Sequence, residues 1–398
     1  MKILLVNKFY YNRGGDCVCM INLEHLLRSK GHDVRVYAMQ YSQNIPCESA
    51  KSFASEVSFS GGGVKGKINA LKRVFGWGDI VPSFKRVLDE FKPDVVHLNN
   101  IHSYLSPVVA QLAKDFGCKV VWTLHDYKLV CPSYSCLSKG QNCELCFTGD
   151  KRNVLKERCM KGSLVASTIA YLEAVKWNRD ALERCTDSFI CPSRFMADKM
   201  LRGGFSQSKL KVLCNFVDPV KYDHLSRLSV DSRQDYYCYI GRMSPEKGVA
   251  SLLEATSKLD IPLKLAGDGP QLEEFRQRYS QCRQIEFLGR VDADTVCDII
   301  SHARFMVMPS VCYENNPLGV IESLCAGTPV LGANIGGIPE LIDIDRTGQI
   351  YTSGDVSSLR QGIVDMNTAS WDYAQIKTDS LSRFSADTHY RKLIELYK

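Results

Sequence analysis

Two glutamates, Glu314 and Glu322, are separated by seven residues that include a turn signal. The residues between them include Asn316, Pro317, Leu318 and Gly319. An asparagine followed by a proline predicts the N-cap and the first residue of a helix, and the next two amides then lack intrahelical partners. Such a helix start favours an anion, while carboxylates accept hydrogen bonds from hydroxyl groups. A phosphate beside two carboxylates predicts a nucleotide-sugar pocket.

Two cations, Arg242 and Lys247, lie in a loop bracketed by Gly241 and Gly248, directly after a strand predicted at 236–240. Arginine can bind two phosphate oxygens at once, and lysine adds a second positive charge. The loop therefore predicts a diphosphate site, with a solvated basic loop as the alternative. A diphosphate site argues against reading the two glutamates as the general acid and base of a hydrolase. Ordinary surface glutamates at a helix start are the remaining alternative.

Glycines and polar residues follow the ends of other predicted strands, where open α/β sheets bind their ligands. Glycines let backbone amides approach a ligand closely, although plain turn chemistry explains them nearly as well. His125 ends a strand predicted at 120–124, and a buried structural histidine is the alternative. His97, Asn99 and His102 are weaker candidates. The remaining binding candidates are Gly14, Gly15, Gly267, Asp268, Gly269, Arg290, Val291, Gly336 and Gly337.

Short apolar runs alternate with amphipathic segments twice along the chain, which predicts two parallel sheets covered by helices. We therefore expect an α/β protein with two doubly wound, Rossmann-like domains that face each other across a cleft. The boundary is expected near Cys191-Pro192-Ser193, after a helix at 164–184, which gives domains at 1–190 and 191–379. A C-terminal helix at about 380–398 is expected to pack back on the first domain.

In these motifs the sequence resembles the retaining glycosyltransferases of family 4, which have the two-domain GT-B fold. The resemblance covers nearly the whole chain and rests on the order of motifs that are weak one by one. They are Gly14-Gly15, His125-Asp126-Tyr127, Gly241-Arg242-Met243-Ser244-Pro245-Glu246-Lys247-Gly248, Gly267-Asp268-Gly269-Pro270, the spaced glutamates and Gly336-Gly337-Ile338-Pro339-Glu340.

The resemblance implies a hexosyltransferase that moves a sugar from a nucleoside diphosphate, UDP before GDP, to a glycan or lipid-linked acceptor with retention. By that resemblance, Arg242 and Lys247 neutralise the leaving nucleoside diphosphate. Glu314 contacts donor-sugar hydroxyls, Glu322 the ribose hydroxyls, and His125 the sugar near the reacting carbon. The implied role is bacterial surface-polysaccharide assembly, such as capsule or O-antigen. A nucleotide-sugar epimerase or hydrolase of the same fold and a non-catalytic nucleotide-sugar-binding scaffold are the alternatives.

Five of the 17 cysteines are concentrated in one segment rich in Ser, Gly and Lys. They are Cys131, Cys136, Cys143, Cys146 and Cys159. The two-residue spacing between Cys143 and Cys146 is typical of a metal knuckle. A structural zinc site is one interpretation, and free thiols in a packed loop are the other. The triplet Asp292-Ala-Asp294 has the spacing of a possible metal site, but it predicts a helix N-cap instead. The loop with Arg242 and Lys247 already supplies positive charge. We therefore expect no catalytic metal and no required cofactor.

Residues 1–190 hold 26 Lys and Arg against 18 Asp and Glu, whereas the whole chain holds 50 against 44. This basic half predicts contact with an anionic surface, with a plain solvated surface as the alternative. After a flexible Gly61–Gly63, the segment Val64–Trp77 mixes apolar residues with Lys65, Lys67, Lys72 and Arg73. It predicts an amphipathic helix that lies on a bilayer or a helix on the acceptor side.

No apolar run reaches the roughly 18 residues of a membrane span, and the opening Lys2–Val6 is too short for a secretory signal. We therefore expect a cytoplasmic protein, peripheral on the inner face of the plasma membrane. No nucleic-acid partner is expected.

Overall fold

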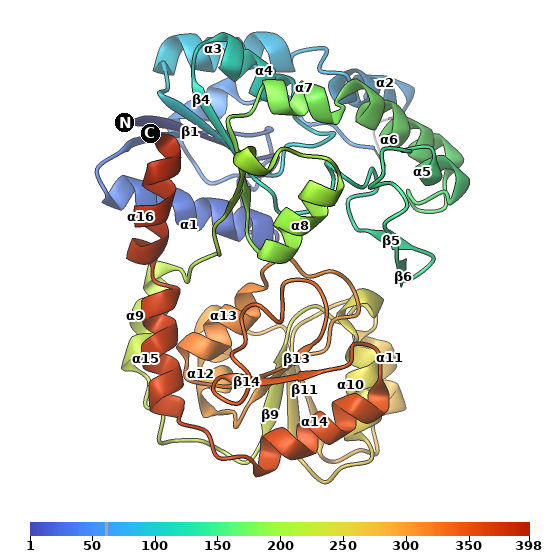
Figure 1. Cartoon of the computed structure of the whole chain (residues 1–398), viewed down its shortest axis with the longest axis vertical. Helices are drawn as coiled ribbons and strands as arrows, with labels where there is room; N and C mark the ends of the chain where they lie inside the picture. The colour runs from blue at the N-terminus through green and yellow to red at the C-terminus, as the bar shows by residue number, and fades with distance from the viewer. Residues whose placement is uncertain (60–62) are drawn as a thin grey trace. The chain divides into compact units, whose positions relative to one another are not determined.

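The computed structural model describes residues 1–59 and 63–398, which form two compact units, Met1–Leu213 with Tyr390–Lys398 and Cys214–His389 (Figure 1). Each unit contains one six-stranded sheet whose neighbouring strands are parallel. The prediction of two doubly wound parallel-sheet domains is confirmed.

The first sheet has the spatial order β2 (Asp33–Tyr37), β1 (Lys2–Val6), β3 (Val95–Leu98), β4 (Lys119–Thr123), β7 (Ser188–Cys191) and β8 (Leu210–Val212). Its central strands are apolar and buried because helices lie on both faces of the sheet (Figure 1). A small antiparallel hairpin, β5 (Leu137–Ser138) and β6 (Gln141–Asn142), stands apart from it. The helices of this unit are α1 (Gly15–Ser29), α2 (Gly63–Val74), α3 (Ile80–Phe91), α4 (Val108–Asp115), α5 (Asn153–Lys156), α6 (Leu164–Lys176), α7 (Arg179–Arg184) and α8 (Arg194–Arg202).

The second sheet has the order β11 (Ile285–Gly289), β10 (Leu263–Ala266), β9 (Tyr237–Ile240), β12 (Met306–Met308), β13 (Val330–Ala333) and β14 (Gly348–Tyr351). In its core Tyr237 stacks on Phe305, with ring centroids 4.9 Å apart. The strand order reverses between β9 and β12, and the loops at such a switch point hold the ligand of an open α/β sheet. The helices of this unit are α9 (Pro219–Arg227), α10 (Val249–Thr256), α11 (Leu272–Arg278), α12 (Ala293–His302), α13 (Leu318–Cys325), α14 (Val356–Thr368) and α15 (Tyr373–Arg383).

The predicted boundary at 190/191 differs from the structure, in which the first unit runs to Leu213. The reason is that Cys191 ends β7 and pairs with Val212 of β8, so the segment expected to join two domains supplies the last two strands of the first sheet. β8 is an edge strand whose three residues are not fully buried, so no continuous apolar run marks it in the sequence. The helix expected at 164–184 is also interrupted, because Asn178 accepts a hydrogen bond from the amide of Ala181 and starts α7.

The last helix, α16 (Ala386–Tyr397), ends in the first unit, to which Tyr390–Lys398 belong. The hydroxyl group of Tyr397, in this helix, lies 2.5 Å from Nδ1 of the buried His97. The other ring nitrogen of His97, Nε2, lies 2.7 Å from Thr123 Oγ1. His97 was a candidate for lining an acceptor site, and the structure shows it holding α16 to the sheet. The preceding helix α15 remains in the second unit, where it packs on α13.

The basic segment at Val64–Trp77 forms most of α2, but one of its four cations does not face outward. Arg73 is 1% exposed, and its guanidinium lies 2.6 Å from Asp79. Ile68, Leu71 and Trp77 are exposed. Gly61 and Gly62 of the predicted hinge, and the side chains of Lys65 and Lys67, lie outside the part of the chain described.

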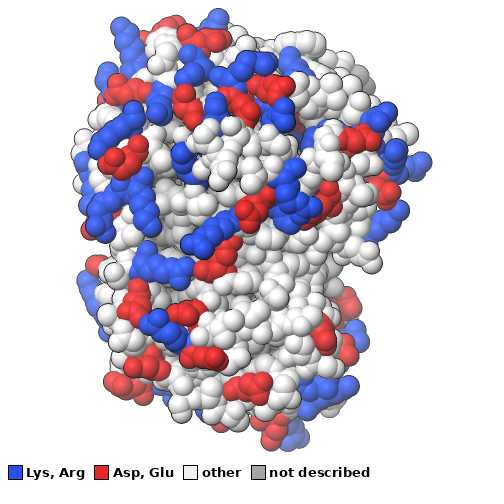
Figure 2. Space-filling model, in the orientation of Figure 1, with Lys and Arg blue, Asp and Glu red and all other residues white. Residues whose placement is uncertain are grey.

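On the face drawn in Figure 2, basic side chains are spread over the first unit with acidic side chains between them. The surplus of cations in the sequence is therefore not gathered into one uninterrupted basic patch on this face. Among the residues described, no helix combines the length and the hydropathy needed to cross a bilayer.

Replacing Tyr397 by Phe should lower the free energy of unfolding by about 1–3 kcal/mol, because it leaves a nitrogen of the buried His97 without its partner. Tyr390→Phe is the matched control on the same helix, since its hydroxyl meets the partly exposed His32 at 2.8 Å. Urea denaturation of both variants measures the difference. Equal losses in the two would contradict the role assigned to the His97 contact.

Candidate active site

The loops that follow β9 and β12 touch each other along their backbones. Gly248 has a φ of 69°, and a Cβ atom on it would lie 1.9 Å from the carbonyl oxygen of Pro309. Only glycine fits this position. The amide of Val311 then donates to the carbonyl of Glu246 at 3.1 Å. These contacts fix the two loops together at the switch point of the second sheet.

Lys247 and Glu314 form an ion pair between these loops. Lys247 Nζ lies 2.5 Å from Glu314 Oε1, and the hydroxyl of the buried Ser310 donates to the same oxygen at 2.7 Å. Burial alone lowers the pKa of Lys247, but the adjoining Glu314 carboxylate raises the pKa above its ordinary value. Lys247 is therefore a fixed cation at neutral pH. The structure brings together two residues that the sequence singles out 67 positions apart.

The backbone of Glu314 is held by the predicted glycine pair. The amide of Gly337 donates to the carbonyl of Glu314 at 2.7 Å. Gly336 has a φ of 62°, and a Cβ atom there would lie 2.3 Å from that same carbonyl oxygen. The two glycines therefore hold the backbone of Glu314 in place. The sequence predicts only a turn at these positions.

Helix α13 begins one residue later than predicted. Its N-cap is Pro317, whereas Asn316 was expected there. The side-chain oxygen of Asn316 is instead occupied by the amide of Asn215 at 2.9 Å and by the thiol of Cys214 at 3.2 Å. Asn316 therefore binds the segment of Cys214 and Asn215 and does not cap α13.

The first amides of α13 are free of protein acceptors among the residues described. They belong to Leu318 and Gly319, as predicted. A Cβ atom on Gly319 would lie 4.0 Å from the carbonyl oxygen of Ile240, the last residue of β9. The start of α13 therefore adjoins the loop that carries Arg242, and its free amides present a partial positive charge at this edge.

Close backbone packing also explains the glycines after β9 and β10. A Cβ atom on Gly267 would lie 1.8 Å from the carbonyl oxygen of Gly241, and one on Gly269 would lie 2.3 Å from that of Met243. The amide of Met243 donates to the carbonyl of Asp268 at 2.9 Å. The predicted strand-end glycines are thus required by contact between neighbouring loops.

Four more predicted positions lie at the same edge or beside it. The side chains of Arg242 and Arg290 are exposed, and neither has an ion pair among the described residues; Val291 follows Arg290 beyond β11. Asp292 accepts a hydrogen bond from the amide of Thr295 at 2.8 Å, which confirms it as a helix N-cap.

Glu322 has a partner that sequence reasoning missed. Its Oε1 lies 2.5 Å from Nζ of Lys221, which belongs to α9, and the two side chains are 14% and 27% exposed. Burial alone lowers the pKa of Lys221, but Glu322 raises the pKa above its ordinary value. Asp218 caps α9 and Pro219 begins it, so the helix is recognisable in the sequence while the pairing across 101 residues is not.

In the first unit a polar cluster forms where β1 and β3 end. Gly14 is the extended N-cap of α1, and a Cβ atom on Gly15 would meet no atom within 4 Å. The side-chain oxygen of Asn7 accepts the amide of Asn100 at 3.0 Å, and Asn100 Nδ2 donates to Asp16 at 3.0 Å. Sequence reasoning missed these three polar residues, although each follows a strand or begins a helix, where ligand groups gather.

His125 lies half-buried beside this cluster, after β4. Its Nε2 lies 3.0 Å from the side-chain oxygen of Asn99. Burial lowers the pKa of His125, against the opposing effect of Asp16 and Asp126, so the ring is neutral at pH 7. Among the described residues the buried Asn99 Nδ2 and Asn100 Oδ1 have no hydrogen-bond partner. Such groups call for a polar partner.

His102 does not extend this cluster. Its ring stacks on Trp122 with centroids 5.3 Å apart, and burial lowers its pKa to about 3. It is a neutral packing residue, in contrast to the acceptor-lining role for which it was a weaker candidate.

Two family descriptions match the sequence. Residues 13–221 match "Glycosyltransferase Family 4", and residues 234–368 match "Glycosyl transferases group 1". A Klebsiella pneumoniae protein described as an uncharacterized 42.6 kDa protein in the cps region is 26% identical over 375 residues, which are 90% of this chain and 91% of that one.

Two solved structures resemble the whole chain. HepE of Anabaena in complex with UDP has a TM-score of 0.66 and 19% identity, over 99% of each chain. The lipopolysaccharide outer core galactosyltransferase WaaB in its apo form has a TM-score of 0.65 and 16% identity, over 100% of this chain and 99% of that one. These likenesses confirm the predicted GT-B fold. With one family match covering more than half of its residues, the chain belongs to the family 4 glycosyltransferases.

Proposed function

We propose that this glycosyltransferase moves a hexose from a UDP-sugar to a glycan or lipid-linked acceptor in cell-surface polysaccharide assembly, with retention at the anomeric carbon. The observation that carries the donor part is the ion pair between Lys247 and Glu314 beside the free amides of α13. UDP in the complex of HepE supports the choice of nucleotide. The cps-region relative and the lipopolysaccharide galactosyltransferase support the surface-polysaccharide role.

In the proposed donor complex the pyrophosphate binds to the positively charged groups at the switch point. Lys247, the exposed Arg242 and the amides of Leu318 and Gly319 stabilise the charge that develops on the leaving phosphate. Glu314 is then released from its lysine and accepts hydrogen bonds from donor-sugar hydroxyls. Glu322, held by Lys221, accepts from the ribose hydroxyls.

The transfer itself needs no protein nucleophile. The bond between the anomeric carbon and the phosphate oxygen breaks, and the acceptor hydroxyl oxygen bonds to that carbon on the same face. The acceptor proton passes to the departing phosphate. His125, being neutral, donates or accepts a hydrogen bond at the sugar without adding a charge. The unpartnered groups of Asn99 and Asn100 support a polar ligand near it.

A lipid-linked acceptor lies in a bilayer, so the enzyme must bind the membrane surface. We assign this membrane contact to the surface formed by α2 and α6. The two helices contact each other. Their exposed apolar side chains are Ile68, Leu71, Leu164, Val165, Leu172 and Val175, with Trp77 just beyond α2. The ammonium group of Lys176 lies 5.2 Å from the ring of Trp77. Apolar side chains bordered by lysines suit an anionic interface.

Lys247→Ala should reduce kcat/KM for the UDP-sugar by about 10²–10³-fold, the usual loss when one group that stabilises transition-state charge is removed. Lys258→Ala is the matched control, since this exposed lysine follows the other end of α10. Steady-state transfer assays with both variants provide the measurement. A Lys247→Ala variant that transfers at the wild-type rate would contradict the role assigned to Lys247. Wild-type protein that binds a UDP-sugar but transfers nothing would be a nucleotide-sugar-binding scaffold, and UDP release without acceptor would identify a hydrolase.

Gly336→Ala should abolish most donor binding, because its Cβ atom would displace the carbonyl of Glu314. Gly354→Ala is the control for backbone strain alone, since its φ is 79° and its Cβ atom would meet nothing within 4 Å. That strain costs about 1–2 kcal/mol. Titration by calorimetry with the UDP-sugar that the wild-type protein binds, with thermal unfolding beside it, compares the two. Similar affinities for that UDP-sugar would show that the position of Glu314 does not matter.

Replacing Leu71 and Trp77 together by Ser should reduce binding to anionic vesicles by about tenfold or more, given the apolar area they offer. Leu201→Ser in α8, with Leu201 46% exposed, is the control within the same unit. Cosedimentation with phosphatidylglycerol and phosphatidylcholine vesicles measures the change. Unchanged binding to both lipids would remove this surface from the proposal.

A further inference from the structure

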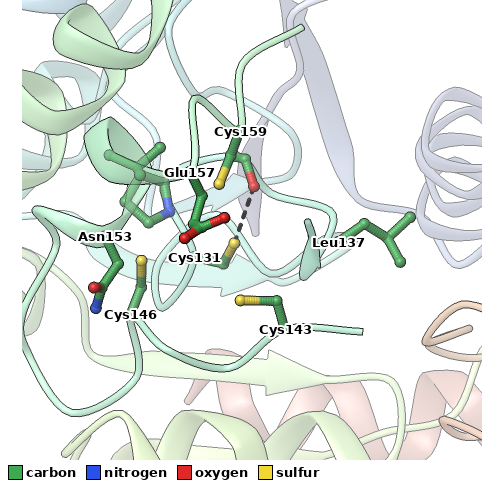
Figure 3. A pocket seen from close by; sticks show the side chains of 10 residues that line it. Cys131, Leu137, Cys143, Cys146, Asn153, Glu157 and Cys159 are labelled. Atoms are coloured by element: carbon green, nitrogen blue, oxygen red, sulfur yellow. Dashed lines mark hydrogen bonds between the residues drawn. The ribbon is translucent and has the colours of Figure 1, made fainter. Parts of the chain in front are cut away.

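Four cysteines line one small cavity in the segment between His125 and α6. They are Cys131, Cys143, Cys146 and Cys159. Figure 3 shows their sulfur atoms turned toward a common space, with the carboxylate of Glu157 drawn among them and Asn153 at the margin. We call the cavity that these four side chains line the thiol pocket. All 17 cysteines of the chain are free thiols.

The backbone around the thiol pocket is tightly organised. The β5–β6 hairpin closes where the amide of Cys143 donates to the carbonyl of Cys136 at 2.7 Å. Glu144, between the two cysteines of the knuckle, is fixed by ion pairs with Lys199 and with Arg202, the latter at 2.5 Å. The backbone amide of Cys159 donates a hydrogen bond to the carbonyl of Val154 at 3.2 Å. These hydrogen bonds and ion pairs therefore hold thiols from three separate turns close together.

The free volume open to the centre of a water molecule is about 10 Å³. A single water-sized body needs roughly this much room. The thiol pocket can therefore take one ion but no organic cofactor. Thiolates are soft ligands, which select zinc over calcium or magnesium.

The charge next to the thiol pocket also lacks a counterion. The half-buried Lys151 donates from Nζ to the carbonyls of Val130 and Cys146, each at 2.8 Å. No carboxylate pairs with it among the residues described. A zinc ion with four thiolates carries two negative charges, so it would supply the anion that this ammonium group lacks.

We propose that the thiol pocket binds one Zn²⁺ through Cys131, Cys143, Cys146 and Cys159. Each thiol loses its proton on binding, and four Zn–S bonds of about 2.3 Å form. No three such groups among the described residues already stand at metal-ligand spacing, so the ion draws the sulfurs inward. Cys136 is fully buried and does not line the cavity, although its thiol is hydrogen-bonded to that of Cys131. The metal is structural, because it fastens the loop that follows His125 and meets no proposed substrate group.

The test measures zinc in the full-length protein purified under reducing conditions. Inductively coupled plasma mass spectrometry should find one zinc per chain. Cys143→Ser and Cys146→Ser should each lose most of it, and Cys136→Ser should retain it. Cys282→Ser in the second unit is the control for a general thiol effect.

A second measurement does not depend on the variants folding. Cobalt added to the metal-free wild-type protein should give the intense visible bands of tetrahedral thiolate coordination. Zinc-free wild-type protein that gives no such bands would overturn the proposal. So would a Cys143–Cys146 or Cys131–Cys136 disulfide found by mass spectrometry in protein kept reduced. Loss of zinc in Cys136→Ser together with its retention in Cys159→Ser would overturn the assigned ligand set.

Discussion

The proposed donor site depends on one half-buried charge pair at the switch point of the second sheet. Lys247 and Glu314 come from two loops that Gly248 and Pro309 lock together. A half-buried ammonium is expensive to desolvate without an anion nearby, and Glu314 supplies that anion within the protein. The lysine is consequently held in place and charged before any ligand arrives. Preorganised charge of this kind is what stabilises a departing phosphate most effectively.

The same pairing sets a condition on the proposed donor. Its phosphate must compete with Glu314 for Lys247, and the released carboxylate must find new hydrogen-bond donors. A free phosphate satisfies only the first requirement, whereas a nucleotide sugar satisfies both because its sugar brings hydroxyl groups. Glu322 repeats the arrangement with Lys221. Two carboxylates that are each compensated by one lysine thus favour a ligand with an anionic centre and hydroxyls at both ends.

The sequence was sufficient for the parts that follow from local chemistry. Buried apolar runs predicted the central strands, and the glycines, Lys247 and Glu314 were singled out because they stand at strand ends. Pairings across long separations were not predictable. Lys221 with Glu322, Asn316 with Asn215, and His97 with Tyr397 become visible only when the sheet order is known. The domain boundary was missed for a different reason, because β8 is a partly exposed edge strand that no continuous apolar run marks.

His125 shows why burial has to be weighed together with neighbouring charge. Asp16 and Asp126 both favour a protonated ring, yet burial outweighs them and lowers the pKa of His125. A neutral histidine cannot compete with Arg242 or Lys247 as a phosphate ligand, which limits it to hydrogen bonding at a neutral group. A sugar hydroxyl is such a group. Within the first unit, the neutral imidazole and the unpartnered side-chain groups of Asn99 and Asn100 therefore offer hydrogen bonds to a ligand without adding charge.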